Sequence, residues 1–478
     1  MSQYRRLNAE IVAKLIDICG KNNVIYGDEE LLEPYSRDEI PGTDYRSMPE
    51  AVLRPSSAEE VSAIMRLANA ERIAVTPRGA GSGLSGGAVP LHGGIVLATD
   101  RMNRILELDK ENMMIVVEPG VVANDINEFL RPHNLFYAGY PMSVETCYIG
   151  GNVAENAGGG KAIKYGVTSR YVLGLEVVLP NGELMELGGK LLKDVTGYNL
   201  LQLFTGSEGT LGVFTKIILK VIPLPKYQFD LLALFPDSRS AIAAVPATML
   251  ESGVTPVSIE YMDQDSFESA CKYLNESLPC EGAGAMLLLS VDGNDSEQMM
   301  DDCEQLGTFL EKNGASLVYV ADTAANSERL WKIRRNVAEA FSLYFPRQSG
   351  EDVVVPPASI AVVAEKFAQL ADKYGVAIPC YGHAGDGNLH SRISAPESWS
   401  DQRWRQTLPK ILEELYAIVA EQGGRISGEH GIGCKRLPYM QSVVSETYLQ
   451  VLRAIKKALD PNNIMNPGKI FSFEPPAN

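Results

Sequence analysis

Positive charge is scarce in this sequence. Its 478 residues include 43 Lys and Arg against 60 Asp and Glu, so the formal net charge at pH 7 is −17. A protein that binds nucleic acid needs a basic face to displace counterions from phosphate, and one that docks on anionic lipid needs basic residues as well. The charge balance therefore argues against both classes of partner.

Long hydrophobic runs and paired cysteines are absent too. No uninterrupted apolar segment approaches the ~20 residues of a spanning helix, and residues 1–20 show the spacing of an amphipathic helix instead of a signal peptide. The seven cysteines are odd in number and lack C-x-x-C spacing, which argues against a disulfide framework or an iron–sulfur cluster. We expect Cys380 and Cys434 to be small buried apolar residues. We expect a cytoplasmic protein, free or held at a membrane through a partner.

The composition that remains, 45% apolar and 22% charged, is that of a globular protein, and the length favours two domains. Short strands alternate with helices from about 50 to 220, with a helix over 56–71 capped by Ser57 and Glu60. Asn181-Gly182 is a hairpin signal. Pro223 and Pro225 mark a boundary, after which strands alternate with long helices in an α+β or α/β second domain. Further helices are predicted over 327–341, 401–422 and 445–460.

Glycine gathers in three segments of the first domain. Gly81-Ser-Gly-Leu-Ser-Gly86 fits G-x-G-x-x-G, but residues 87–94 contain Pro90 and further glycines and cannot form the helix that a dinucleotide fold requires. Such a loop can still turn its N–H groups toward an anion, with Arg78 and Ser82 as further donors. The others are 149–160, and 194–199 running into 206–212. Each alone could be a surface loop, but together they indicate a large ligand threaded through the domain.

Three of the five histidines stand in two glycine-rich stretches, His383 to His390 and Ser427 to Gly433. His383 and His390 would face opposite sides of a straight strand. The turn signal at Gly385-Asp-Gly387 allows a hairpin or bend that brings both imidazoles to one side. With Glu429 they would make a divalent-metal site with open coordination positions. The alternative is two hydrogen-bonded histidines near a turn.

Taken in order, PRGAGSGLSGG, IGGNVAENAGGG, DVTGYNL, LFTGSEGTLG, YGHAGDGNLH, SGEHGIG and NPGK resemble the FAD-linked D-2-hydroxyacid dehydrogenases, which have the vanillyl-alcohol-oxidase type of FAD-binding domain. The resemblance covers about residues 45–472. It implies an α+β protein with a two-part FAD-binding domain over 1–224 (core 45–224). A substrate-cap domain over 225–424 would carry the metal-binding histidines, and a helical segment over 425–478 would return to the FAD domain.

The resemblance also implies site residues. His383, His390 and Glu429 would hold zinc, iron or manganese, and His430 would be the general base that takes the hydroxyl proton before hydride passes to the flavin. Arg334 would bind the substrate carboxylate, whereas Arg335 is expected at the surface. Some relatives bind flavin covalently through a histidine where this chain has Ser82, so FAD should be non-covalent. The FAD-binding positions would be Pro77, Arg78, Gly79, Ala80, Gly81, Ser82, Gly83, Pro141, Ser143, Thr146, Gly150, Gly151, Glu155, Gly158, Glu208, Gly209 and Gly212.

Two finer points concern the substrate. Asn388, between the histidines, is a candidate hydrogen-bond donor to substrate, or simply a turn residue. Enzymes for 2-hydroxyglutarate carry a lysine shortly before a D-x-x-x-P run, and here the run at 352–356 is preceded by Glu351, which should repel a second carboxylate. We therefore expect D-lactate or glycolate rather than D-2-hydroxyglutarate as substrate.

The electrons would pass to a protein acceptor, such as electron-transfer flavoprotein or an iron–sulfur subunit. Two other classes stay open at this point. One is a flavin-free metal hydrolase or lyase, and the other is an electron-transfer subunit that has lost turnover.

Overall fold

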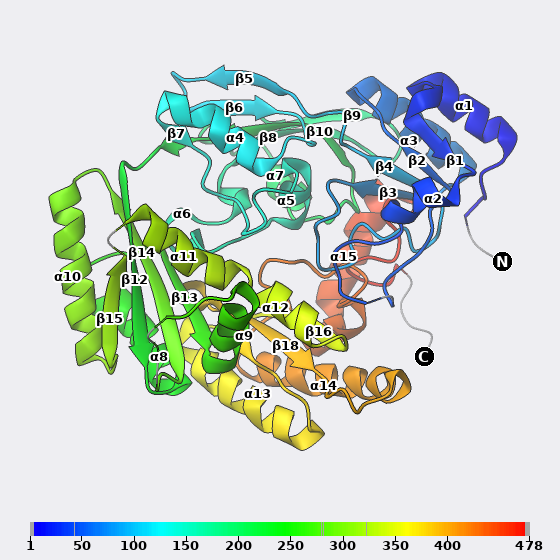
Figure 1. The fold of residues 1–478 in the computed structure, drawn as a ribbon. Coiled ribbons are helices and arrows are strands. Elements are labelled where there is room, and N and C mark those ends of the chain that lie inside the picture. The colour runs from blue at the N-terminus through cyan, green and yellow to red at the C-terminus, as the bar shows by residue number, and fades with distance from the viewer. Residues whose placement is uncertain (1–3, 43, 279, 281, 322, 474–478) are drawn as a thin grey trace. The chain divides into compact units, whose positions relative to one another are not determined.

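The computed structural model describes residues 4–42, 44–278, 280, 282–321 and 323–473 (Figure 1). The chain forms two compact units. The first comprises Met1–Gly158, Val167–Leu224 and Glu429–Asn478, and the second comprises Gly159–Gly166 and Pro225–Gly428. The chain thus passes between the units several times, and one passage falls between Gly428 and Glu429.

The first unit contains two main sheets. One has the order β1-β2-β4-β3, in which β4 pairs in parallel with β2 and β3. The other is antiparallel, with the order β5-β6-β10-β8-β9. The strands are β1 Val24–Tyr26, β2 Ala51–Leu53, β3 Val75–Arg78, β4 Ile95–Ala98, β5 Ile105–Asp109, β6 Met114–Val117, β8 Val172–Val178, β9 Leu184–Gly188 and β10 Val213–Lys220, with β7 Leu135–Phe136 and β11 Ile222–Pro223 as a separate pair.

The helices of the first unit show why these residues fold locally as they do. The N–H of Glu60 donates to the Ser57 hydroxyl and so caps α3, as predicted, while the Glu60 carboxylate accepts from the N–H of Ser56 rather than Ser57. Asn181-Gly182 makes the predicted turn, here between β8 and β9. The helices are α1 Ala9–Cys19, α2 Glu29–Leu32, α3 Ala58–Glu71, α4 Ala123–Leu130, α5 Ile149–Glu155, α7 Leu200–Phe204 and α15 Glu446–Leu459.

The second unit is built on one seven-stranded antiparallel sheet with the order β15-β12-β14-β13-β17-β18-β16. Side chains alternate between its faces. Leu232 packs with α9 (Gln264–Leu274), α11 (Ala324–Arg335) and α12 (Val337–Tyr344), whereas Leu231 packs with α10 (Ser296–Lys312). The strands are β12 Tyr227–Phe235, β13 Ser258–Asp263, β14 Ala285–Gly293, β15 Leu317–Ala321, β16 Gln348–Val354, β17 Cys380–His383 and β18 Asn388–Ser394.

The helices of the second unit are α6 Ala162–Tyr165, α8 Ser238–Glu251, α9 Gln264–Leu274, α10 Ser296–Lys312, α11 Ala324–Arg335, α12 Val337–Tyr344, α13 Ile360–Tyr374 and α14 Asp401–Glu421. The predicted helix over 327–341 is divided at Asn336, whose backbone leaves the helical region and separates α11 from α12. With its mixed sheets and helices the chain has the predicted α+β class.

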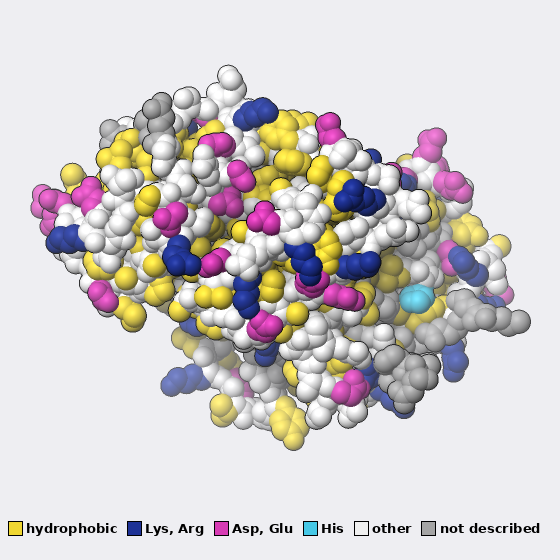
Figure 2. Space-filling model, turned by 90° about the horizontal axis from the view of Figure 1, so that it is seen from below, with side chains coloured by type: hydrophobic (Ala, Val, Ile, Leu, Met, Phe, Trp, Pro, Cys, Tyr) yellow, Lys and Arg dark blue, Asp and Glu magenta, His cyan; other side chains and the backbone are white. Residues whose placement is uncertain are grey.

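All seven cysteines are free thiols, with Cys380 buried and Cys434 half-buried. No helix among the described residues combines the length and the apolarity that crossing a membrane requires. Figure 2 shows acidic and basic side chains interspersed with apolar ones on the face that it presents.

Candidate active site

A large cavity opens in the first unit, with about 1380 Å³ of empty space including its opening to solvent. Residues 77–83, 150–158 and 208–212 contribute to its lining, and all of the predicted FAD-binding positions line it except Thr146. Thr146 is exposed, and its hydroxyl donates to the backbone oxygen of Ser143. Three glycine-containing segments far apart in the sequence therefore form one cradle.

The first glycine loop has the shape of an anion cradle. Gly81 has φ +79°, a left-handed conformation that favours glycine. The N–H groups of residues 80–83 donate to no described residue, so they are available to a diphosphate. Beside this loop, a Cβ added at Gly151 would meet nothing within 4 Å. These features fit FAD. The Arg78 guanidinium, predicted as a further donor, donates instead to the backbone oxygens of Arg37 and Pro34.

The segment 194–199 takes no part in this cradle. It does not line the cavity, and Val195 and Tyr198 are 97% and 95% exposed. The N–H of Thr196 donates to the Asp194 carboxylate, so the turn residues close a surface loop. The expectation of three ligand-binding glycine segments is therefore wrong for this one, although the adjoining 208–212 segment does line the cavity.

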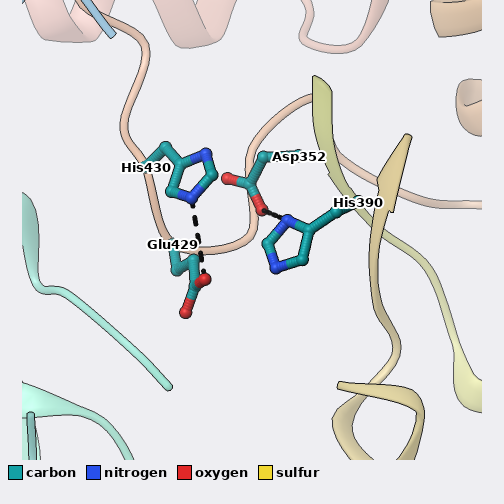
Figure 3. A group of neighbouring side chains, drawn as sticks. All are labelled: Asp352, His390, Glu429 and His430. Carbon is teal, nitrogen blue, oxygen red and sulfur yellow. Dashed lines mark ion pairs between the residues drawn. The ribbon is translucent and has the colours of Figure 1, made fainter. Parts of the chain in front are cut away.

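Glu429 and His430 also line the cavity of the first unit. Nε2 of His430 lies 3.7 Å from Oε1 of Glu429, and a Cβ added at Gly158 would lie 3.3 Å from Oε2 of Glu429. An imidazole and a carboxylate thus stand beside the predicted cofactor site. Figure 3 draws this pair together with Asp352 and His390 of the second unit.

Glu208 holds the loop that carries His430. Its two carboxylate oxygens accept hydrogen bonds from the N–H of Ile432 at 2.7 Å and of Gly433 at 2.6 Å. Burial raises the pKa of Glu208, and the two N–H donors oppose that rise. Burial and the charge of Glu208 also hold the pKa of neighbouring Glu155 well above its ordinary value, which favours the protonated acid there.

In the second unit, His383 and His390 come together as the turn signal predicted. The hairpin of β17 and β18 pairs Tyr381 with His390 and His383 with Asn388, which puts both imidazoles on one face of the sheet. Their ring centroids are 5.4 Å apart and the rings are nearly perpendicular. Residues 384–387 make the bend that this pairing needs.

Glu260 on β13 stands behind His383. This carboxylate is fully buried and lies 2.7 Å from Nδ1 of His383. It also accepts a hydrogen bond from Nε of Arg334 at 2.8 Å, and Nη2 of the same guanidinium lies 2.8 Å from Oε2 as an ion pair. A carboxylate on one ring nitrogen orients a histidine and presents the other nitrogen, Nε2, to a metal. Burial alone would raise the pKa of Glu260, but the charges of His383 and Arg334 hold it below its ordinary value.

Asp352 occupies the equivalent place beside His390. The two residues face each other in the register of β16 and β18, with Oδ1 of Asp352 3.6 Å from Nδ1 of His390. Asp352 also accepts hydrogen bonds from the Ser427 hydroxyl at 2.8 Å and from the N–H of Gly428 at 3.1 Å. Glu429 is the next residue in the chain, so covalent connection keeps its backbone near this carboxylate.

Asn388 and the two arginines have definite partners. Nδ2 of Asn388 donates to Asp352 at 2.7 Å and to the backbone oxygen of Val353 at 3.0 Å, so its amide nitrogen is already engaged. The guanidinium of Arg334 is buried on Glu260 and lies 5.1 Å from the centroid of the Tyr381 ring. Arg335 is exposed and pairs with Glu328, as predicted for a surface charge.

Glu351 does not face the histidines. Strand β16 alternates, so Glu351 lies on the face opposite Asp352, where it accepts hydrogen bonds from the Ser349 hydroxyl and the Tyr416 hydroxyl. The expectation that its charge would repel a second substrate carboxylate is therefore wrong. A preference between monocarboxylate and dicarboxylate substrates needs other grounds.

Glu260 and Asp352 are the site residues that sequence reasoning missed. The only signal for Glu260 was a charged residue inside the apolar run SIEYMD, and Asp352 served only to mark a D-x-x-x-P run. The role of each depends on strand pairing, because β13 and β16 bring them beside histidines more than 30 residues away.

Comparison with known proteins agrees with this geometry. Residues 49–188 match the FAD binding domain, and residues 224–470 match the C-terminal domain of FAD linked oxidases. The glycolate oxidase subunit GlcD of Bacillus subtilis is 37% identical over 466 residues, which cover 98% of this chain and 97% of that protein. The D-lactate dehydrogenase of Anaerostipes hadrus is 37% identical over 473 residues, which cover 98% of each.

Among solved structures, 4-ethylphenol oxidase from Gulosibacter chungangensis has a TM-score of 0.77 at 22% identity, with 98% of each chain covered. This likeness bears on the fold, which is of the predicted vanillyl-alcohol-oxidase type. The chain belongs to the FAD-linked oxidases. It is an FAD-linked oxidoreductase, and the family resemblance of its motifs is confirmed.

Proposed function

We propose that this enzyme oxidises a small D-2-hydroxy acid to the 2-oxo acid, with FAD and a divalent metal, and that D-lactate is the foremost candidate substrate. The observation that carries the proposal is the presence of His430 in the lining of the flavin cavity. An imidazole beside a flavin suits removal of a hydroxyl proton near neutral pH. Two similar proteins are named for glycolate and D-lactate, which favours these acids and keeps glycolate as the alternative.

His383, His390 and Glu429 would hold the metal. The support for this ligand set is the pair of neighbouring imidazoles, the Glu260 carboxylate on Nδ1 of His383, and the hydrogen bond from Gly428 to Asp352 just before Glu429. Two histidines and a carboxylate suit zinc, iron or manganese. Asp352 would steady His390 as Glu260 steadies His383.

The chain's own residues would divide the work. The glycine cradle binds the diphosphate of non-covalent FAD, since Ser82 stands where a linking histidine would be needed. His430 takes the proton of the substrate hydroxyl, while Arg334 and Asn388 remain candidates for contact with substrate. Bound metal would lower the pKa of that hydroxyl and bound FAD would accept the hydride. An electron-accepting protein, such as electron-transfer flavoprotein or an iron–sulfur subunit, would then reoxidise the flavin.

The base is tested by His430→Gln, with His133→Gln as the matched control because His133 does not line the cavity. Anaerobic stopped-flow absorbance follows flavin reduction by D-lactate. General-base catalysis contributes about 10²- to 10⁴-fold, so we expect a fall of that size in His430→Gln with flavin and metal content unchanged. Reduction at the wild-type rate in His430→Gln would overturn the assignment.

A further inference from the structure

A second arginine stands on the histidine-bearing face of the sheet. Arg392 lies two residues after His390 on β18, so both side chains project from the same face. On the neighbouring strands, Arg392 lies opposite Gly350 and beside the pair formed by Tyr381 and His390. Nothing in the motifs marked this residue, since it follows the histidine stretch.

The charge of Arg392 is buried without a countercharge. The residue is 6% exposed, Nε donates to the Tyr381 hydroxyl and Nη1 donates to Oε1 of Gln348, both at 3.2 Å. Both acceptors are neutral, and no carboxylate of the described residues pairs with this guanidinium. Buried arginines are normally paired, because an isolated buried charge is strongly unfavourable.

The other buried cation on this face shows the contrast. Arg334 is 4% exposed, and its charge is met by Glu260. Any anion that binds Arg334 must therefore share it with a carboxylate that also serves His383. Arg392 has no carboxylate partner among the described residues, so an anion that binds it does not compete with one.

The backbone opposite is shaped for this guanidinium. A Cβ added at Gly350 would lie 2.9 Å from Nη1 and 3.0 Å from Cζ of Arg392. A side chain at position 350 would push the guanidinium out of its present place. The glycine thus lets the planar guanidinium lie against β16. Arg392 is two residues from His390 along β18, a distance of about 7 Å.

We propose that Arg392 binds a carboxylate of the substrate. The inference rests on the proposed function, in which the substrate is a hydroxy acid held at His383, His390 and Glu429. A guanidinium fork matches a carboxylate in two parallel hydrogen bonds. Arg392 therefore supplies the countercharge for the acid, a task that the sequence had left to Arg334.

The test compares Arg392→Met and Arg392→Lys with Arg335→Met, a control at an exposed arginine. Stopped-flow flavin reduction by D-lactate, glycolate and D-2-hydroxyglutarate gives rate and half-saturation for each acid. Calorimetry with pyruvate on the oxidised enzyme gives product affinity without turnover. Losing a charged hydrogen-bonding partner should raise half-saturation and pyruvate Kd about 10- to 100-fold in Arg392→Met. The limiting rate should change little, and Arg392→Lys should be intermediate.

The outcomes separate the possibilities. Weaker binding of all three acids places the C1 carboxylate at Arg392, and weaker binding of D-2-hydroxyglutarate alone places a second carboxylate there. Unchanged binding of every acid and of pyruvate overturns the proposal. Thermal melting adds a control, because removing an uncompensated buried charge should leave Tm equal or higher, whereas a purely structural arginine would lower it. If no acid reduces the wild-type flavin, the proposed function fails, and pyruvate calorimetry still decides the role of Arg392.

Discussion

Replacing Glu260 by glutamine should weaken metal binding and destabilise the protein together. The carboxylate has no exposed surface and contacts two partners, Nδ1 of His383 at 2.7 Å and the Arg334 guanidinium at 2.8 Å. Glutamine has nearly the same shape but no charge. It leaves His383 without its orienting carboxylate and Arg334 buried without its countercharge.

The two effects have different sizes. Loss of the carboxylate behind a ligating histidine lowers metal affinity about 10- to 100-fold. Breaking a buried ion pair by removing one charge costs about 3–5 kcal/mol, because the other charge stays buried alone. Glutamine still offers an oxygen to Arg334, so we expect the lower end, about 3 kcal/mol.

Urea unfolding of the metal-free protein measures the stability, and competition with a chelator measures the metal affinity. The double variant Glu260→Gln/Arg334→Met removes both charges, so stability should largely return. Metal affinity should stay low in the double variant, because His383 still lacks its carboxylate. Wild-type metal affinity in Glu260→Gln would refute His383 as a ligand, and unchanged stability would refute the ion-pair reasoning.

The loop after His430, the Asp263 carboxyl and the metal site can each be perturbed separately. Glu208→Gln loses one of two acceptors for the loop after His430, so flavin reduction per bound FAD should slow, and an unchanged rate per bound flavin would contradict this. Burial raises the pKa of Asp263 to about 6; the folded state then holds the proton more tightly than the unfolded chain, and stability falls as pH rises toward and through 6. Between pH 5 and 7 the free energy of unfolding of the wild type should therefore fall by about 1 kcal/mol relative to that of Asp263→Asn, which still caps α9. The same pH dependence of the free energy of unfolding in both proteins, measured by urea unfolding, would contradict the raised pKa. Chelation should abolish flavin reduction without releasing FAD, and added zinc, iron or manganese should restore it.

The sequence allowed the local features to be predicted. The α3 cap at Ser57, the β8–β9 turn and the long helix over 401–421 depend on neighbours within a few residues, and each was found. The hairpin that joins His383 to His390 also depends on a local turn, at residues 384–387. Local chemistry and near neighbours decide such elements.

Features that depend on strand pairing across the sheet could not be predicted from the sequence. Glu260 and Asp352 face the histidines only because β13 pairs with β17 and β16 pairs with β18. The position of Glu351 was predicted wrongly because side chains alternate between the two faces of β16. The sequence does not show which residues of β16 point toward the histidines. The exposure of residues 194–199 likewise depends on how a loop leaves β9, which glycine content does not reveal.

The most direct test of the central claim is anaerobic mixing of the purified enzyme with D-lactate, L-lactate, glycolate and D-2-hydroxyglutarate while flavin absorbance is recorded. The account predicts a yellow protein whose flavin bleaches with a D-2-hydroxy acid, D-lactate foremost, and not with L-lactate. Chelation should abolish bleaching, and His430→Gln should slow it about 10²- to 10⁴-fold. A protein that carries FAD but is bleached by none of these acids, or one that is colourless when pure, would contradict it.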